Sequence, residues 1–111
     1  KQADLAIVRR VETGLPPEAR LLAFGLTLTF QHYSHLETLE LYRLSQSQLA
    51  DLLAEGRPTF LLLDVDNVET QWRDQPLADN YSWLRDVVGL ERIGQFGSYT
   101  FFEVNGNAEA P

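Results

Sequence analysis

The pattern of hydrophobic and polar positions is most distinctive between Pro58 and Asn67. Residues 60–63 include no polar position, whereas a strand with one face in water alternates apolar and polar residues. Continuous apolar strands are typical of mainly parallel sheets that are covered on both faces. The run therefore predicts a central strand with helices on both sides of the sheet.

Several segments have the apolar spacing of amphipathic helices, namely residues 3–11, 46–55 and 81–88. Ser45 and Gln48 have the spacing of a capping box, which predicts where the second of these helices begins. Asp66 and Glu69 repeat that spacing and predict a further helix from 67 to about 72, with Pro76 interrupting it. Residues 25–34 alternate like a strand but suit a short helix equally well, and we interpret them as the helix.

Further strands are predicted at residues 20–25, 36–44, 91–96 and 99–104. The second of them carries charges, as edge strands do. Gly97-Ser98 joins the last two as a hairpin of the glycine-first type. The order of elements predicts an α/β fold, a Rossmann-like three-layer sandwich with a mainly parallel sheet and a C-terminal antiparallel hairpin. We expect one domain over residues 1–104 and a disordered polar tail at 105–111.

Composition narrows the function classes. The chain of 111 residues has a net charge of −7, and Lys1 is its only lysine. This composition argues against P-loop phosphate binding and Schiff-base chemistry, because both need a well-placed lysine. The acidic balance also argues against nucleic-acid binding, which needs a basic surface. The lack of cysteine excludes disulfides and thiolate metal sites. No window is apolar for long enough to cross a bilayer. Because the sequence also lacks methionine, we expect it to be a piece of a longer polypeptide.

The acidic pair Asp64 and Asp66 is the main candidate for chemistry, as a metal site at the carboxyl end of the central strand. Aspartate phosphatases of the haloacid-dehalogenase type use such a pair, but they need a later lysine. Nucleotide-sugar transferases hold manganese through Asp-x-Asp, but their nucleotide fold is longer than this chain. The favoured alternative is that Asp66 caps a helix and Asp64 closes the preceding turn.

Aromatic and histidine residues give a second set of candidates, for contact with a glycan or a partner. His32 and His35 could ligate a metal, but no further ligands follow at a recognisable spacing, and a polar surface turn with Tyr33 against the sheet edge is favoured. Trp72, Tyr81 and Trp83 could form a sugar platform, whereas aromatic residues of the core are the commoner explanation. The candidate contacts are His32, Tyr33, Trp72, Tyr81 and Trp83.

Taken together, several segments resemble the soluble C-terminal domain of bacterial multi-spanning glycosyltransferases of the family 39 type, relatives of the dolichyl-phosphate-mannose protein mannosyltransferases. The likeness lies in residues 23–33, 41–45, 61–65, 81–84 and 93–102. Its most telling parts are the Phe24-Gly25 strand end and the closing run Gly94-Gln95-Phe96-Gly97-Ser98-Tyr99-Thr100-Phe101.

The resemblance implies an accessory domain on the extracytoplasmic face of the membrane, in an enzyme that transfers a sugar from a polyprenyl-phosphate donor. It implies no catalytic residue and no cofactor in this chain, because the catalytic acid of such enzymes lies between membrane helices. Implied partners are the transmembrane part of the same polypeptide and a glycan or protein acceptor. The acidic charge balance separately argues against a nucleic-acid partner. The alternatives are a stand-alone Asp-x-Asp metal-dependent phosphatase or sugar-nucleotide enzyme, and a protein-interaction module.

Overall fold

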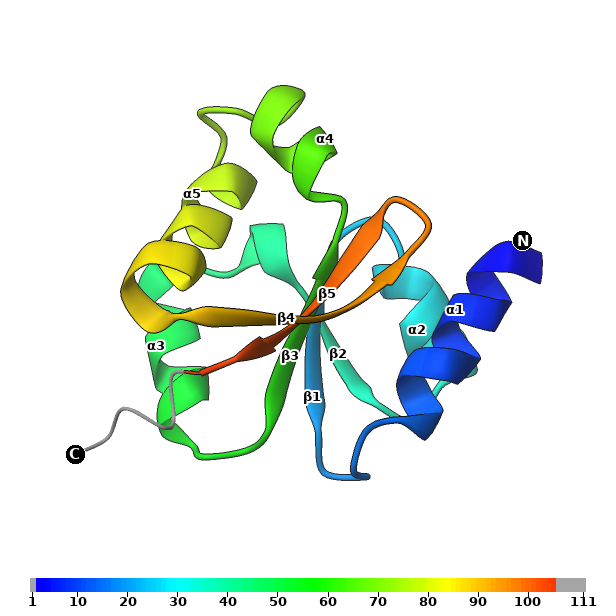
Figure 1. Cartoon of the computed structure of the whole chain (residues 1–111). Coiled ribbons are helices and arrows are strands. Elements are labelled where there is room, and N and C mark those ends of the chain that lie inside the picture. The colour runs from blue at the N-terminus through cyan, green and yellow to red at the C-terminus, as the bar shows by residue number, and fades with distance from the viewer. Residues whose placement is uncertain (1, 106–111) are drawn as a thin grey trace.

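A five-stranded sheet forms the middle of the computed structural model, which describes residues 2–105 (Figure 1). Its strand order is β2-β1-β3-β5-β4. The strands are β1 (Arg20–Ala23), β2 (Glu37–Glu40), β3 (Thr59–Leu63), β4 (Leu90–Phe96) and β5 (Tyr99–Val104). All five residues of β3 are buried, which confirms the central strand that the apolar run predicts. The charged strand β2 lies at an edge, also as predicted.

The sheet is mixed, so the prediction of a mainly parallel, Rossmann-like sheet is wrong. β1 pairs in parallel with β2 and β3, but β5 pairs antiparallel with both β3 and β4. Because β4 and β3 both run opposite to β5, they run in the same direction but are not neighbours. An α/β architecture with a C-terminal antiparallel hairpin remains.

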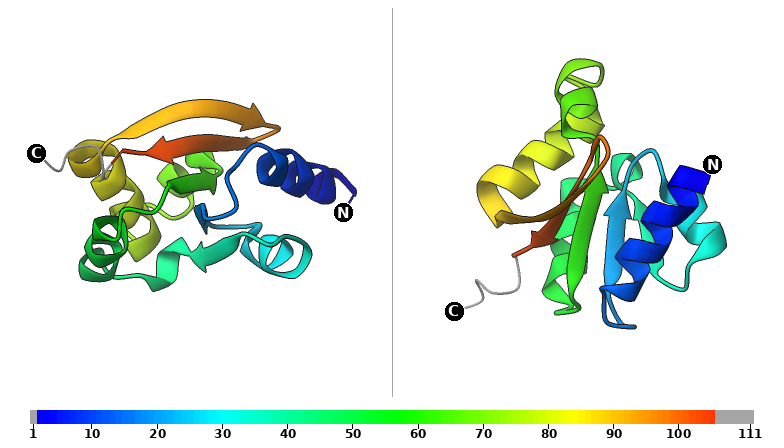
Figure 2. Two further views of the ribbon diagram at one scale, coloured as in Figure 1. Left: turned by 90° about the horizontal axis from the view of Figure 1, so that it is seen from below. Right: turned by 45° about the vertical axis from the view of Figure 1, so that its right-hand side comes forward.

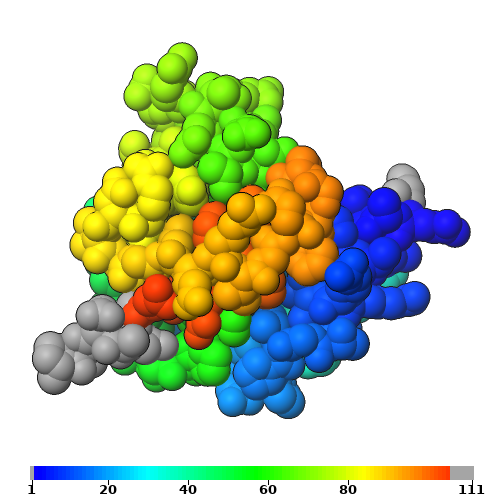
Figure 3. Space-filling view, in the orientation of Figure 1, coloured from blue at the N-terminus to red at the C-terminus, as the bar shows by residue number. Residues whose placement is uncertain are grey.

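The hairpin explains the mixed sheet. A two-residue turn forces β5 to run back along β4, and Gly97 has the positive φ of 62° that a glycine-first turn requires. β5 buries Phe101, Phe102 and Val104 and takes the place beside β3. β4 is mostly exposed or half-buried and lies at the edge. Figure 3 shows this strand at the surface between α5 and α1.

Helices cover both faces of the sheet. One core lies against α1 (Gln2–Thr13) and α2 (Thr27–Tyr33). The opposite core lies against the 3₁₀ turn η1 (Leu41–Arg43), α3 (Gln46–Ala54), α4 (Val65–Thr70), α5 (Pro76–Trp83) and the π-helical turn η2 (Leu84–Val88). Figure 2 shows the sheet between α5 and α1. Alternate residues of β3 serve the two cores, with Phe60 and Leu62 in the first and Leu61 and Leu63 in the second.

Local signals predict several helix boundaries correctly. Ser45 and Gln48 form the capping box, with the Ser45 hydroxyl accepting from the Gln48 amide at 3.0 Å and the Gln48 side chain accepting from the Ser45 amide at 2.9 Å. Residues 27–33 are helical, as interpreted. The predicted helix at 81–88 begins too late, because α5 already begins at Pro76. Pro76 therefore does not interrupt a helix but occupies the first turn of one. The N–H that proline lacks has no intrahelical acceptor at this position, so no hydrogen bond is lost.

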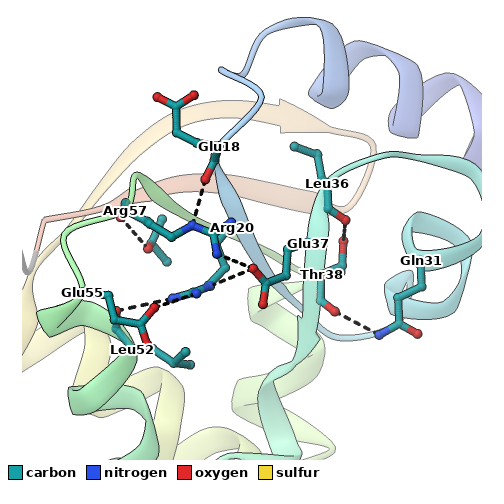
Figure 4. A network of polar contacts seen from close by, with 10 residues as sticks. Glu18, Arg20, Gln31, Leu36, Glu37, Thr38, Leu52, Glu55 and Arg57 are labelled. Atoms are coloured by element: carbon teal, nitrogen blue, oxygen red, sulfur yellow. Dashed lines mark hydrogen bonds and ion pairs between the residues drawn. The ribbon is translucent and has the colours of Figure 1, made fainter.

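The amino ends of the parallel strands are held by a buried arginine (Figure 4). Arg20 of β1 donates to the Glu55 carboxylate at 2.8 Å and to the Leu52 carbonyl at 3.4 Å, and its Nε lies 3.5 Å from the Glu37 carboxylate. Arg57 also binds Glu37. A buried cation is stable only with such partners, and these connect β1 to β2 and α3.

The predicted tail at 105–111 falls almost entirely outside the described residues. Asn105 is described, and its amide donates to the Gly89 carbonyl at 2.9 Å. Residues 106–111 lie beyond the described part of the chain.

Candidate functional site

A groove lies where the parallel strands β1 and β2 end. Phe24 follows β1 directly, and η1 with Tyr42 follows β2 directly. Trp72 follows α4, the helix that begins just after β3. Open α/β sheets bind ligands outside the carboxyl ends of their strands, so the groove lies where such sheets hold their ligands.

Three aromatic rings form a continuous wall in this groove. The Phe24 and Trp72 ring centroids are 5.2 Å apart with an interplanar angle of 75°, and those of Phe24 and Tyr42 are 5.9 Å apart at 86°. Edge-to-face pairs of this kind contribute roughly 0.5–1.5 kcal/mol each beyond area burial. The rings line a hollow of about 350 Å³, together with Gln75, Pro76 and Leu77.

Asn80 holds η1, which carries Tyr42, in place. Asn80 is 4% exposed, and its side-chain amide donates to the Leu41 carbonyl at 3.0 Å and to the Leu44 carbonyl at 2.7 Å. These bonds fix η1, and therefore Tyr42, against α5. The aromatic wall is thus positioned by a buried polar contact as well as by packing.

A second hollow of about 490 Å³ shares Tyr42 with the first. Its wall comes from α2, β2 and η1, and includes Thr27, Gln31, Glu40 and Arg43. The guanidinium carbon of Arg43 lies 5.6 Å from the centroid of the Tyr42 ring. Polar groups therefore adjoin the aromatic groove on the β2 side.

Glu40 is the electrostatically unusual group of this second hollow. Burial raises the pKa of its carboxyl, against smaller lowering effects from the Thr27 hydroxyl, the Tyr42 and Leu41 amides and the Arg43 charge. The first of these lowering effects is the hydrogen bond between the Thr27 hydroxyl and the Glu40 carboxylate. The Thr27 hydroxyl oxygen and Oε2 of Glu40 are both buried.

The predicted metal candidates have structural roles in α4. Asp64 is the N-cap of the helix, and its carboxylate accepts from the Asn67 amide at 3.1 Å. The prediction that Asp66 caps a helix starting at Asn67 is therefore wrong, because the helix begins two residues earlier and Asp66 is exposed in its first turn. Within residues 2–105, no three His, Asp or Glu side chains are grouped as metal ligands.

His32 and Tyr33 lie at the exposed end of α2. Their ring centroids are 4.7 Å apart, and both side chains line a shallow surface hollow with Leu28, Thr29 and Gln31. His35 lies beyond the helix and contacts the Glu12 carboxylate of α1. The structure therefore does not bring these residues into the aromatic groove.

The three residues of the predicted sugar platform are separated. Tyr81 is buried in the core, where its ring lies 6.2 Å from that of Phe102. Trp83 ends α5 and is half-buried against the same core. Trp72 precedes α5, so an eight-residue helix about 12 Å long lies between the two tryptophans. Of the three, only Trp72 lines the groove.

Sequence reasoning missed Phe24, Tyr42 and Glu40 as members of a site. Their common signal is position, since each lies at or just after the carboxyl end of a parallel strand. Tyr42 could not be recognised in this way, because the predicted second strand ran through it to Leu44, whereas β2 ends at Glu40.

No described helix in residues 2–105 combines the length and the apolar character needed to cross a membrane. Comparisons of the chain with protein-family models, with curated proteins and with solved structures find no match.

Proposed function

We propose that this chain is a non-catalytic accessory domain of a polytopic membrane glycosyltransferase, on the extracytoplasmic face, and that its aromatic groove binds a sugar unit of the glycan or glycosylated acceptor. The observation that carries the binding proposal is the wall of Trp72, Phe24 and Tyr42 at the carboxyl edge of the sheet. The membrane context rests on the sequence resemblance described above.

The groove has the chemistry that sugars need. Apolar C–H faces of a pyranose pack on aromatic rings, and Tyr42 is 44% exposed and so available for this contact. The hollow of about 350 Å³ has the size of small-molecule sites, and Gln75 supplies an amide that can both donate and accept. A mainly apolar pocket with few polar groups is typical of ligand sites.

A structural role for the acidic pair also supports this proposal. Asp64 already accepts a hydrogen bond as the cap of α4, and Asp66 lies on the exposed side of the same turn. The groove in turn contains aromatic and amide groups, which favour binding over chemistry.

The test is to titrate the domain with neutral oligosaccharides and to measure binding by calorimetry and by NMR chemical-shift changes. Tyr42→Ala should lower the affinity of any oligosaccharide bound by about tenfold or more, which corresponds to about 1.4 kcal/mol. Tyr33→Ala is the matched control, because Tyr33 is also an exposed tyrosine but lies on α2 outside the groove. Absence of oligosaccharide binding, or equal losses in the two variants, would contradict the proposal.

A further inference from the structure

We infer that the four-residue turn from Trp72 to Gln75 presents the sugar-binding groups of the groove. Gln75 is its hydrogen-bonding residue, and Asp74 is the positioning residue that holds Trp72 and Gln75 in place through its backbone. The inference rests on the proposed function, because it assigns the groups of the same groove that select a sugar. The turn lies in the connection between α4 and α5 (Figure 1).

The two ends of this turn lie at the same hollow. The backbone amide of Gln75 donates to the Trp72 carbonyl at 3.0 Å, which closes the turn. Trp72 and Gln75 both line the hollow of about 350 Å³, where the Trp72 ring packs on Phe24. A single short turn therefore supplies the groove with both an indole ring and a carboxamide.

The backbone of the turn is strained at Asp74. Its φ is 66°, and it is the only non-glycine residue with a positive φ in the described part of the chain. Asp74 is the third residue of the turn, where a positive φ is ordinarily taken by glycine or asparagine. Strained backbone of this kind is concentrated at functional sites, and here it lies between the two groove residues.

The proline after the turn restricts Gln75 as well. A residue before proline is disfavoured in the helical conformation, and Gln75 is extended, with φ of −104° and ψ of 160°. The backbone is thus constrained at two successive residues, Asp74 and Gln75. A turn constrained in this way is preorganised, so a ligand that binds to it loses little affinity to the ordering of the chain.

The Gln75 carboxamide is available to a ligand. Gln75 is exposed and occupies the N-cap position of α5, but its side chain makes no cap hydrogen bond there. A carboxamide donates through its nitrogen and accepts through its oxygen. Two adjacent hydroxyl groups of a pyranose match this pair, while the sugar ring packs on the aromatic wall.

The first experiment measures by calorimetry the affinity of Asp74 variants for neutral trisaccharides of mannose, glucose and galactose. Asp74→Val should lower the affinity by about tenfold, because a β-branched residue disfavours a positive φ and the turn then adopts the binding geometry less often. Asp74→Gly should bind as wild type does, since glycine adopts the same backbone readily. Arg73→Val is the matched control, because it places the same side chain at the neighbouring turn position, where φ is negative.

The second experiment tests the hydrogen bond. Gln75→Ala should lower the affinity by about fivefold, as expected for the loss of a neutral hydrogen bond. Gln71→Ala is the control, because the Gln71 carboxamide lies one residue before Trp72 and accepts from the Asn67 side chain in an exposed contact.

A spectroscopic measurement separates positioning from a general loss of stability. In protein labelled with fluorotryptophan, the fluorine NMR resonance of Trp72 can be assigned from Trp72→Phe. This resonance should shift in Asp74→Val, while that of Trp83 should not. Urea unfolding checks that each variant is folded.

Equal losses of affinity in Asp74→Val and Asp74→Gly would show that the carboxylate itself contacts the sugar, and would overturn the positioning role. An unchanged Trp72 resonance in Asp74→Val would also overturn it. Unchanged affinity in both Asp74→Val and Gln75→Ala, with loss in Tyr42→Ala, would overturn the whole inference and leave the proposed function standing. Absence of binding to wild type would overturn both.

Discussion

The hydroxyl oxygen of Tyr99 lies only 2.9 Å from the position that a Cβ atom on Gly25 would occupy. Gly25 has φ of 99° and turns the chain from β1 towards α2, while Tyr99 begins β5. Burial, with the nearby charges of Asp4 and Asp64, raises the pKa of the Tyr99 phenol above its ordinary value. The phenol therefore stays neutral at physiological pH and packs directly on the glycine.

Gly25→Ala should lower the free energy of unfolding by about 2–3 kcal/mol, because it combines an unfavourable positive φ with a steric conflict. Urea denaturation measures the change. Tyr99→Phe in the Gly25→Ala background should recover only the steric part. Gly14→Ala is the control, since the nearest atom to a Cβ there is at an ordinary 3.6 Å. Equal stability of Gly25→Ala and wild type would show that the loop adapts freely.

Glu37 should make stability depend on pH in the acid range. The hydrogen bond from Arg57 and the charge of Arg20 hold the pKa of its carboxyl below the ordinary value of 4.5. Since the folded state binds this proton more weakly, the stabilisation is present above about pH 4.5 and is lost as the pH falls through the lowered pKa.

Glu37→Gln should therefore lower the free energy of unfolding at pH 7, by less than about 1 kcal/mol because the group is half exposed. The difference from wild type should disappear in acid. Urea unfolding from pH 7 down to pH 3 tests this. If the stability difference between wild type and Glu37→Gln grew as the pH fell, the prediction would be contradicted.

Asp64 and Asp66 should differ in their effect on α4. Asp64→Ala removes the cap that accepts from the Asn67 amide and should cost about 1 kcal/mol. Asp66→Ala removes only a favourable charge in the first turn and should cost about 0.3 kcal/mol. Chemical denaturation of the two variants in parallel shows which substitution costs more stability. A larger loss for Asp66→Ala would indicate that Asp66 is the helix cap, as the sequence pattern predicts.

Asn80→Ala should both destabilise the fold and loosen the groove. It leaves the Leu41 and Leu44 carbonyls without their buried donor, which should cost about 2 kcal/mol. Faster amide hydrogen exchange around η1 should accompany the loss. Asn67→Ala provides the comparison, because the Asn67 side chain makes an exposed contact with Gln71. Similar stability changes in the two variants would argue against a positioning role for Asn80.

Local signals predict those parts of the fold that depend on neighbouring residues. Ser45 and Gln48 form their capping box within one turn of helix, so no distant contact is needed to recognise it. The apolar run of β3 is equally direct, because full burial on both faces leaves no place for a polar side chain.

Other features depend on contacts that the sequence order does not show. β5 lies beside β3 because this position buries Phe101 and Phe102. The antiparallel pairing of β5 with β3 makes the sheet mixed, whereas the order of elements predicts a mainly parallel sheet. The site has the same origin, because Phe24, Tyr42 and Trp72 belong to three connections that meet only in the folded chain. Asp64 and Asp66 are not distinguished by the sequence, because either can cap a helix and the capping-box spacing from Asp66 to Glu69 favours the later one, whereas the cap is Asp64.

The irregular outer strand β4 has a consequence for behaviour at high concentration. Its pairing with β5 shifts register between Arg92 and Gly94, and Glu91 and Arg92 are exposed there. A bulged, charged margin offers another polypeptide a poor template for backbone pairing. This margin of the domain therefore resists edge-to-edge growth into fibrils, although β4 is paired on one side only.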